Sequence, residues 1–232
     1  MKKVLITGAR GFIGKNLVAT LKEMNDIEIL AFTRDDGKKQ IDQYTKDCDF
    51  VFHLAGSNRP KDIKEFMRGN YHLTNELIES LKLNDNICPI VYSSSIQAEM
   101  DNPYGQSKKA GEDLIFKHSE ETGAKVFIYR LPNVFGKMCR PNYNSAVATF
   151  CYNIAHYLPI TVNNPSIVMN LVYIDDVIEE FINALEDKAN MDGVFCKVPV
   201  EHSITLGEIV DLIYSFKKSR EERSIPDMSD AF

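Results

Sequence analysis

Residues 4–21 read VLITGARGFIGKNLVATL, and this stretch decides the fold of the chain. The apolar run Val4–Ile6 is typical of a buried strand, and the apolar residues after the glycines recur near a helical period. Gly8 permits a tight turn, Gly11 permits close approach of a pyrophosphate, and Gly14 permits close packing of helix on strand. The stretch therefore predicts a strand, a glycine turn and a helix.

The expected helix begins near the third glycine, and its first backbone N–H groups have no helical partner. These N–H groups and the positive end of the helix dipole favour an anion. The alternative is a glycine turn that only packs a helix on a sheet, which the agreement of strand, turn and helix disfavours. We expect a dinucleotide site formed here by Gly8, Arg10, Gly11, Phe12, Ile13 and Gly14.

Short apolar runs and longer helical patterns alternate along the first half of the chain. The expected strands are Val4–Ile6, Ile27–Phe32, Phe50–His53, Ile90–Ser93 and Val126–Tyr129. The expected helices are Phe12–Met24, Phe66–Leu83 and Gly105–Glu121. This order predicts an α/β fold, a Rossmann-like, doubly wound parallel sheet with helices on both faces.

The second half is less regular and predicts a small C-terminal substrate-binding lobe. Its expected elements are helices Ser145–Tyr157, Asp175–Glu186 and Ile209–Lys218 and strands Leu171–Tyr173 and Val194–Lys197. The motif TLGE at residues 205–208 is a capping box that opens the last helix. We expect residues 1–232 to form one domain, with a cofactor core of about 1–157, a lobe mainly at 158–218 and a polar tail at 219–232, where Pro226 breaks any helix.

The composition excludes several classes of protein. Of the 232 residues, 44% are hydrophobic and 26% are charged, a composition typical of globular proteins. The net charge of −6 disfavours nucleic acid as the main partner, because binding to phosphates needs a basic surface. No apolar run is long enough to span a membrane, and we expect no signal peptide before the first strand. The five cysteines lack a CxxC pair and the histidines lack metal-binding spacing, so we expect reduced thiols, a cytoplasmic protein and no metal.

The residues after the second strand bear on the choice of nicotinamide cofactor. A carboxylate at the end of this strand would bind the ribose of NAD and repel a 2′-phosphate. Thr33 stands about where that acid would be, and Arg34 follows it. Arg34 and Arg10 suit a phosphate and favour NADP (NADPH), whereas Asp35 or Asp36 would favour NAD if the strand were longer.

A candidate catalytic set lies at the fourth strand and the helix after it. Tyr104 and Lys108 in the sequence YGQSK share one helix face, and a nearby ammonium lowers the pKa of a phenol, so we expect Tyr104 to exchange protons near neutral pH. Ser93–Ser95 end the fourth strand at the carboxyl edge, where open α/β sheets hold their chemistry. A polar strand end and a helix-start tyrosine are the alternatives, which the glycine turn disfavours.

Together, TGARGFIG at residues 7–14, the serine triplet and YGQSK resemble the extended short-chain dehydrogenase/reductase family, also called the NAD-dependent epimerase/dehydratase family. Further motifs of this family are matched in order by HLAG at 53–56, NYHLT at 70–74, RLPNVFG at 130–136 and VYIDD at 172–176, though the last can simply cap a helix. The resemblance implies that Ser95 is catalytic beside Tyr104 and Lys108. It also implies cofactor contacts from Leu54, Ala55, Gly56, Ser93, Lys108 and Pro132, and substrate-site roles for Asn70, Ser95 and Asn133.

Members of this family act on nucleotide-linked sugars as epimerases, dehydratases or reductases. Ile96 and Gln97 follow Ser95 where a dehydratase has an acidic pair, which disfavours dehydration. The stretches at residues 93–108, 129–155 and 204–220 resemble the reductase domain of bifunctional capsular polysaccharide enzymes that make UDP-2-acetamido-2,6-dideoxy-β-L-talose. The resemblance implies NADPH-dependent reduction of a UDP-linked 4-keto sugar, with Arg140, Asn142, Tyr143 and Asn144 as further candidate contacts unless they form a plain surface loop.

Two other functions stay open from the sequence: an NAD-dependent UDP-sugar 4-epimerase and a non-catalytic NADP-binding protein. The resemblance also implies a homodimer formed through the helices that hold Asn70 and Tyr104. The metal-binding cupin domain of the bifunctional enzymes is not present in this sequence. We therefore expect either a shortened chain or a one-domain relative.

Overall fold

The computed structural model describes residues 1–225, so the expected helix break at Pro226 lies outside the described residues. The chain divides into two compact units: the first contains Met1–Leu131 and Asp175–Pro199, and the second contains Pro132–Ile174 and the chain from Val200 onward. This division differs from the expected boundary near residue 157. The return of residues 175–199 to the first unit follows from helix α7 (Ile174–Leu185), whose Phe181 ring lies 5.7 Å from that of Phe52 in the core of that unit.

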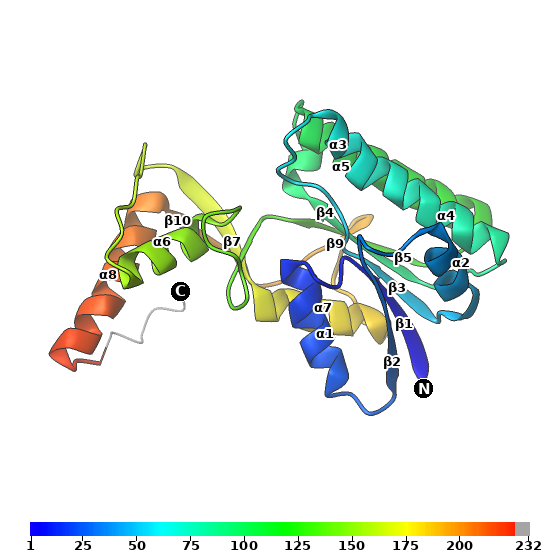
Figure 1. The fold of residues 1–232 in the computed structure, drawn as a ribbon, viewed down its shortest axis with the longest axis horizontal. Helices are drawn as coiled ribbons and strands as arrows, with labels where there is room; N and C mark the ends of the chain where they lie inside the picture. Colours follow the sequence, from blue (N-terminus) through cyan, green and yellow to red (C-terminus); the bar gives the residue numbers. More distant parts are fainter. Residues whose placement is uncertain (226–232) are drawn as a thin grey trace. The chain divides into compact units, whose positions relative to one another are not determined.

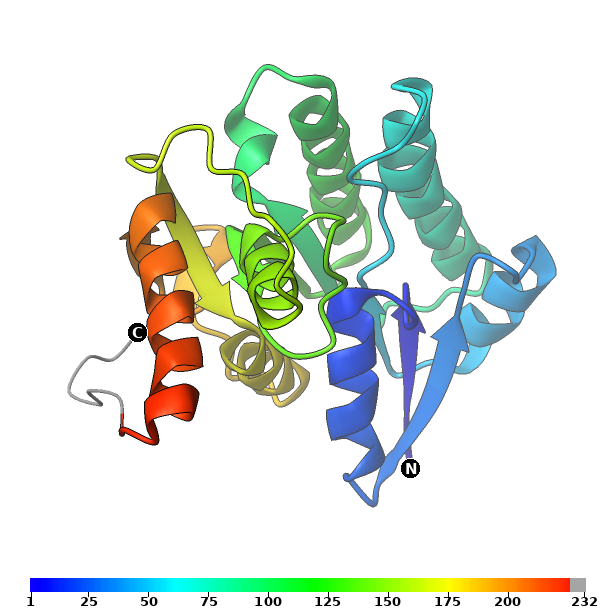
Figure 2. The ribbon, with the colours of Figure 1, turned by 60° about the vertical axis from the view of Figure 1, so that its left-hand side comes forward.

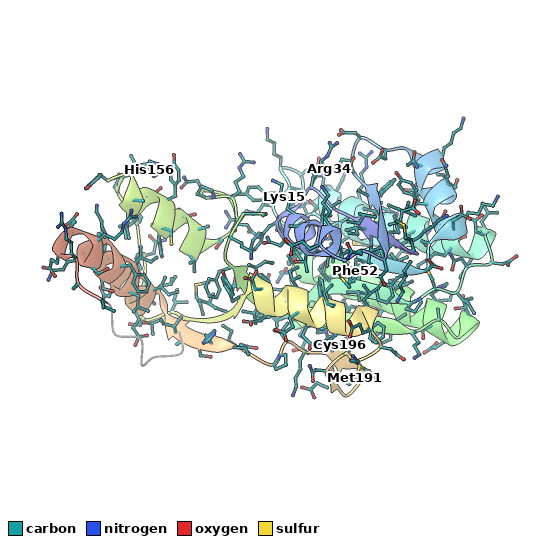
Figure 3. The ribbon with its side chains drawn as sticks, turned by 90° about the horizontal axis from the view of Figure 1, so that it is seen from below. Lys15, Arg34, Phe52, His156, Met191 and Cys196 are labelled. Carbon is teal, nitrogen blue, oxygen red and sulfur yellow. The ribbon has the colours of Figure 1, made fainter. Side chains whose placement is uncertain are left out.

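The first unit is built on a seven-stranded sheet, which confirms the expected fold class. In spatial order the strands are β2 (Ile27–Phe32), β1 (Lys2–Thr7), β3 (Phe50–His53), β4 (Ile90–Ser95), β5 (Val126–Leu131), β9 (Phe195–Cys196) and β8 (Met191–Asp192). Neighbouring strands are parallel except for β8 and β9, where Cys196 Sγ lies 3.4 Å from Met191 Sδ (Figure 3). The order reverses between β1 and β3, and ligands of open α/β sheets bind beyond the carboxyl ends of strands at such a point.

Helices cover both faces of this sheet. Figure 1 shows α2 (Lys38–Asp47), α4 (Leu73–Leu83) and α5 (Pro103–Thr122) on one face and α1 (Phe12–Lys22) and α7 on the other. The sequence KKQIDQYTKD of α2 did not predict a helix because it is mostly polar, and its buried residues are Ile41 and Thr45. The short 3₁₀ helix η2 (Ile96–Glu99) joins β4 to the segment before α5.

The helix expected at Phe66–Leu83 is not regular. It consists of α3 (Lys64–Phe66), a wide π-helical turn η1 (Met67–His72) and α4. Such turns contain an extra residue and are frequent at functional sites. Asn70 lies inside this turn and is buried.

The second unit contains a three-stranded sheet and two helices. The sheet order is β10 (His202–Thr205), β7 (Val168–Tyr173) and β6 (Asn133–Phe135), and Figure 2 shows α6 (Ala146–Ala155) and α8 (Leu206–Glu222) beside β7. Their shared core contains Phe150, Ile154, Leu171 and Ile209. The capping box at Thr205 and Glu208 is confirmed, and α8 extends four residues beyond Lys218 into the expected tail. Within residues 1–225, no helix combines the length and apolarity needed to cross a bilayer.

Substitution of Gly14 by alanine tests the docking of α1 on the glycine turn. A Cβ at Gly14 would lie 2.2 Å from the carbonyl oxygen of Gly8 and 2.9 Å from Ala9 Cα, so backbone must move. We expect Gly14→Ala to lower the free energy of unfolding by about 2 kcal/mol, measured by urea denaturation. Gly37→Ala is the control because a Cβ there meets no atom within 4 Å, and an equal loss in both variants would contradict the prediction.

Candidate active site

The glycine turn brings β1 against the segment after β3. Gly8 has φ of +74°, and a Cβ there would lie 2.7 Å from the backbone nitrogen of Ala55, so a side chain would separate these segments. Gly11 is the N-cap of α1; no side chain caps the helix, and its first turn contains no acidic residue. The backbone N–H groups of this first turn therefore remain open to an anion. The cradle fits the pyrophosphate of a dinucleotide, and it unites the predicted residues from Gly8 to Gly14 with Leu54 and Ala55.

A buried chain of hydrogen bonds runs from this turn to the π-helical turn. Thr7 Oγ1 lies 2.7 Å from His53 Nδ1, and His53 Nε2 lies 2.8 Å from Thr74 Oγ1. Thr74 Oγ1 donates to the carbonyl oxygen of Asn70, and Thr7 Oγ1 accepts from the N–H of Ala55. Each hydroxyl has one proton, so Thr7 donates to Nδ1 and the proton of neutral His53 is on Nε2.

The protonation state of His53 agrees with this assignment. Complete burial, with a smaller contribution from the charge of Lys108, lowers the pKa of His53 to about 3. The imidazole is therefore neutral at physiological pH and joins the two segments as one donor and one acceptor.

Asn70 is 1% exposed, and its amide is bound within the protein. Nδ2 donates to the Ser57 carbonyl at 2.9 Å and to Ser107 Oγ at 2.8 Å, while Oδ1 accepts from the Ser57 N–H at 2.9 Å. Both amide protons are thus occupied. These bonds favour a supporting role for Asn70 over the direct substrate contact included in the expectation.

The serine triplet ends β4 with three different environments. Ser93 Oγ donates to the His53 carbonyl, and Ser94 Oγ donates to a buried carboxylate of Glu112. Ser95 caps η2, where its hydroxyl accepts from the Gln97 N–H, and the same hydroxyl acts to lower the pKa of Tyr104. Ser95 is thus the member of the triplet whose hydroxyl meets the predicted catalytic phenol.

Tyr104 lies in the first turn of α5, and its expected pKa shift is wrong. Burial, its largest cause, raises the pKa of Tyr104, and the hydrogen bond with Ser95 offsets part of that rise. The expected lowering by Lys108 is absent because the ammonium is directed to β4. In this state the phenol holds its proton at neutral pH.

Lys108 is buried beneath the end of β4. Its Nζ donates to the carbonyl oxygen of Ser93 at 2.6 Å and lies 4.8 Å from the centroid of the Tyr92 ring. Burial lowers the pKa of Lys108 to about 8, and the negative charge of Glu112 opposes this change. Gly56 leaves room for the Asn70 amide beside the ammonium, since a Cβ there would lie 2.7 Å from Asn70 Oδ1.

Glu112 and Arg130 form an ion pair beside this site that the sequence reasoning missed. Glu112 is fully buried, and its carboxylate accepts two hydrogen bonds from Arg130 and one from Ser94. Their positions in the sequence could have drawn attention to them, because Glu112 is one helical turn beyond Lys108 and Arg130 begins the motif RLPNVFG. Their pairing was not visible because they are 18 residues apart.

The predicted cofactor-selecting residues lie beyond the end of β2 and, for Arg10, in the glycine turn. Asp36 Oδ2 accepts from the Thr33 N–H at 2.7 Å and from its hydroxyl at 2.9 Å. Arg10 Nη1 lies 2.5 Å from Asp35 Oδ2, and both side chains are largely exposed. Arg34 follows Thr33 at this end of β2 and is labelled in Figure 3.

The other predicted contacts belong to the second unit. Pro132 begins this unit, and Asn133 Nδ2 donates to the Asn170 carbonyl at 3.3 Å. The loop before α6 holds the exposed residues Arg140, Asn142, Tyr143 and Asn144. The Arg140 guanidinium lies 5.4 Å from the Tyr143 ring, and Asn142 has a φ of +53°. The first unit thus unites the predicted cofactor and catalytic residues other than Pro132, whereas these loop residues stand on a separate unit.

The chain belongs to the NAD dependent epimerase/dehydratase family, whose model matches residues 4–195. It is 47% identical, over 219 residues and 94% of its length, to the UDP-2-acetamido-2,6-beta-L-arabino-hexul-4-ose reductase of Pseudomonas aeruginosa. It is similar to the crystal structure of the capsular polysaccharide assembling protein CapF from Staphylococcus aureus, with a TM-score of 0.89 and 42% identity over 98% of the chain. The chain spans 59% and 61% of the lengths of these two relatives.

A more distant structure shares the fold alone. The UDP-glucuronic acid 4-epimerase of Bacillus cereus, solved in complex with NAD, has a TM-score of 0.81 and 21% identity, with 93% of this chain and 84% of that chain covered.

The neutral state of His53 predicts a specific loss of stability in acid. Its pKa is about 3 in the folded protein and about 6.5 when unfolded, so the unfolded state binds the extra proton between these values. The contribution of neutral His53 to the free energy of unfolding is present above pH 6.5. It falls as the pH decreases, and by pH 5 it has fallen by about 2 kcal/mol.

Urea denaturation at pH 7, 6 and 5 checks this contribution. We expect His53→Gln to be less stable than wild type at pH 7 but to lose less stability on acidification, because glutamine does not titrate. Other groups, His118 included, titrate in both proteins and cancel in the comparison. Equal pH slopes for the two proteins would contradict the prediction.

Proposed function

We propose that this chain uses NADPH to reduce the C4 ketone of a UDP-linked 4-keto-6-deoxy-N-acetylhexosamine during synthesis of capsular or surface polysaccharide precursors. The observation that carries the proposal is the grouping of three residues: Ser95 ends β4, and Tyr104 and buried Lys108 lie one helical turn apart on α5. The substrate class is supported by the 47% identity to a UDP-4-keto-sugar reductase and by the similarity to CapF.

The chemistry of reduction agrees with the state of the phenol. Bound NADPH would supply the hydride to C4, and the carbonyl oxygen must then gain a proton. The raised pKa of Tyr104 keeps that proton available at neutral pH, and Ser95 can hydrogen-bond the same oxygen. Lys108, with a pKa of about 8, is mostly cationic at pH 7 and favours the phenolate that remains after proton transfer.

The residues of the second unit have a proposed role in binding. Asn133, Arg140, Asn142, Tyr143 and Asn144 are our candidates for contacts with the UDP-sugar. The guanidinium of Arg140 is suited to a diphosphate, and the Tyr143 ring is suited to stacking on a flat group. A cytoplasmic location and a homodimer through α4 and α5 remain predictions, and sedimentation velocity would measure the oligomeric state.

Replacement of Tyr104 by phenylalanine tests the proposed reaction. We expect Tyr104→Phe to reduce kcat by about 10³-fold because the proton donor is lost, while the packing of the ring is retained. Absorbance at 340 nm measures turnover with UDP-4-keto sugars, and fluorescence titration measures NADPH binding, which should be retained.

A Tyr104→Phe variant with substantial turnover would refute the assigned proton donor. Interconversion of UDP-sugars by wild type without net NADPH oxidation would instead support the 4-epimerase alternative. NADPH binding without any reaction in wild type would support the non-catalytic alternative.

The choice of NADPH rests on the residues at the end of β2. Asp36 is engaged with Thr33, and Asp35 neutralises Arg10, so a 2′-phosphate would compete with Asp35 for that guanidinium. We expect Arg34→Ala to weaken NADPH binding about tenfold with little effect on NADH. Asp35→Asn should strengthen NADPH binding by releasing Arg10.

Calorimetric titration of both variants with NADPH and NADH measures these affinities directly. If Asp35 instead binds the ribose of NAD, Asp35→Asn will weaken NADH and Arg34→Ala will affect both cofactors equally. That result would refute the preference for NADPH.

A further inference from the structure

A buried ion pair lies beside the proposed catalytic groups and is not explained by them. Glu112 Oε1 accepts from Ser94 Oγ at 2.5 Å and from Arg130 Nε at 3.0 Å, and Oε2 accepts from Arg130 Nη2 at 2.7 Å. The Glu112 side chain is fully buried and that of Arg130 is 18% exposed. Because a buried ion pair is often no more stabilising than apolar side chains of similar volume, stability alone is a weak reason for it.

The pair connects four elements around the end of β4. Glu112 belongs to α5, Ser94 to β4 and Arg130 to β5. Arg130 Nη1 also donates to Glu99 Oε1 at 2.5 Å, and Glu99 is the last residue of η2. Since η2 follows Ser95 and precedes Tyr104, these bonds restrain both ends of the η2 turn, which lies between the two proposed catalytic residues.

The same carboxylate acts on the charge of Lys108. The ammonium contacts the Ser93 carbonyl and the Tyr92 ring on β4. Glu112 lies one helical turn further along α5, and neutral His53 is on β3. Burial favours the neutral amine, and the negative charge of Glu112 favours the cation.

The surroundings of Glu112 include two further cations. Arg130 is paired with it, and Lys109 Nζ lies 3.9 Å away at the surface. The pKa of Tyr92, which is buried beside Lys108, is raised chiefly by burial and stays above neutrality, so Tyr92 contributes no charge there.

We propose that Glu112 is a positioning residue of the reductase site: its carboxylate keeps Lys108 protonated and, through Ser94 and Arg130, holds Ser95 and the Ile96–Glu99 turn in place for Tyr104. The inference rests on the proposed roles of Ser95, Tyr104 and Lys108. It assigns part of the pH dependence of the reaction to a residue outside the cofactor and substrate contacts.

The proposed effect of the Glu112 charge on Lys108 is tested by Glu112→Gln, which removes the charge and keeps the shape of the side chain. We expect the pKa of Lys108 to fall by about one unit, because the negative charge that opposes the lowering effect of burial is then absent. NMR of the lysine side chains in the cofactor-free protein measures this pKa, with the Lys108 signal assigned from Lys108→Arg. The basic limb of the kcat/KM profile should move to lower pH by the same amount.

Two matched variants separate charge from position. Asp113→Asn removes the neighbouring exposed carboxylate, which pairs with Lys109, and should leave the Lys108 pKa and the pH profile as in wild type. Ser94→Ala keeps the Glu112 charge, so it should leave the Lys108 pKa unchanged while kcat falls about fivefold.

An unchanged Lys108 pKa in Glu112→Gln would overturn the electrostatic role, and an unchanged kcat in Ser94→Ala would overturn the positioning role. If Glu112→Gln does not fold because Arg130 loses its buried partner, the double variant Glu112→Gln/Arg130→Met removes both charges. The Lys108 pKa should still fall in that protein. A wild-type protein without turnover would refute the proposed function, whereas the pKa comparison would still decide the role of Glu112.

Discussion

The burial of the Lys108 ammonium constrains the structure around it more than any other interaction of the first unit. A buried cation is tolerated only where hydrogen bonds and opposite charge replace water. Lys108 can reach the Ser93 carbonyl because α5 lies close to β4, where a Cβ at Gly111 would be 2.2 Å from the Tyr92 hydroxyl. The proposed proton chemistry of Tyr104 depends on this approach.

The buried polar groups form one continuous layer at the carboxyl ends of β1, β3 and β4. Thr7, His53 and Thr74 connect the glycine turn to Asn70 in the π-helical turn. Asn70 in turn donates to Ser107 on α5. Each link satisfies a donor or acceptor that would otherwise be buried without a partner. The cofactor cradle and the catalytic helix are therefore fixed to the same layer of hydrogen bonds, so a displacement at either end breaks a buried bond.

Sequence patterns were sufficient where a local rule determines the structure. The bounds of β2 and β3 and the capping box of α8 agree with the structure because apolar runs and cap residues act locally. The π-helical turn was not predictable, since tertiary hydrogen bonds of Asn70 accompany it. The raised pKa of Tyr104 was also not predictable, because burial is absent from a spacing argument. The pairing of Glu112 with Arg130 joins two elements and requires the fold itself.

The proposed determinants of reaction and of cofactor choice differ in their physical setting. The Glu112 carboxylate is fully buried, so removal of the Arg130 guanidinium takes away its closest compensating charge inside the protein. Arg10 and Asp35 form an exposed pair, which water and salt weaken and which can rearrange at little cost. Cofactor preference can therefore change through exposed substitutions that leave the fold intact. The chemistry at Tyr104 cannot change in this way, because its supporting charges are part of the core.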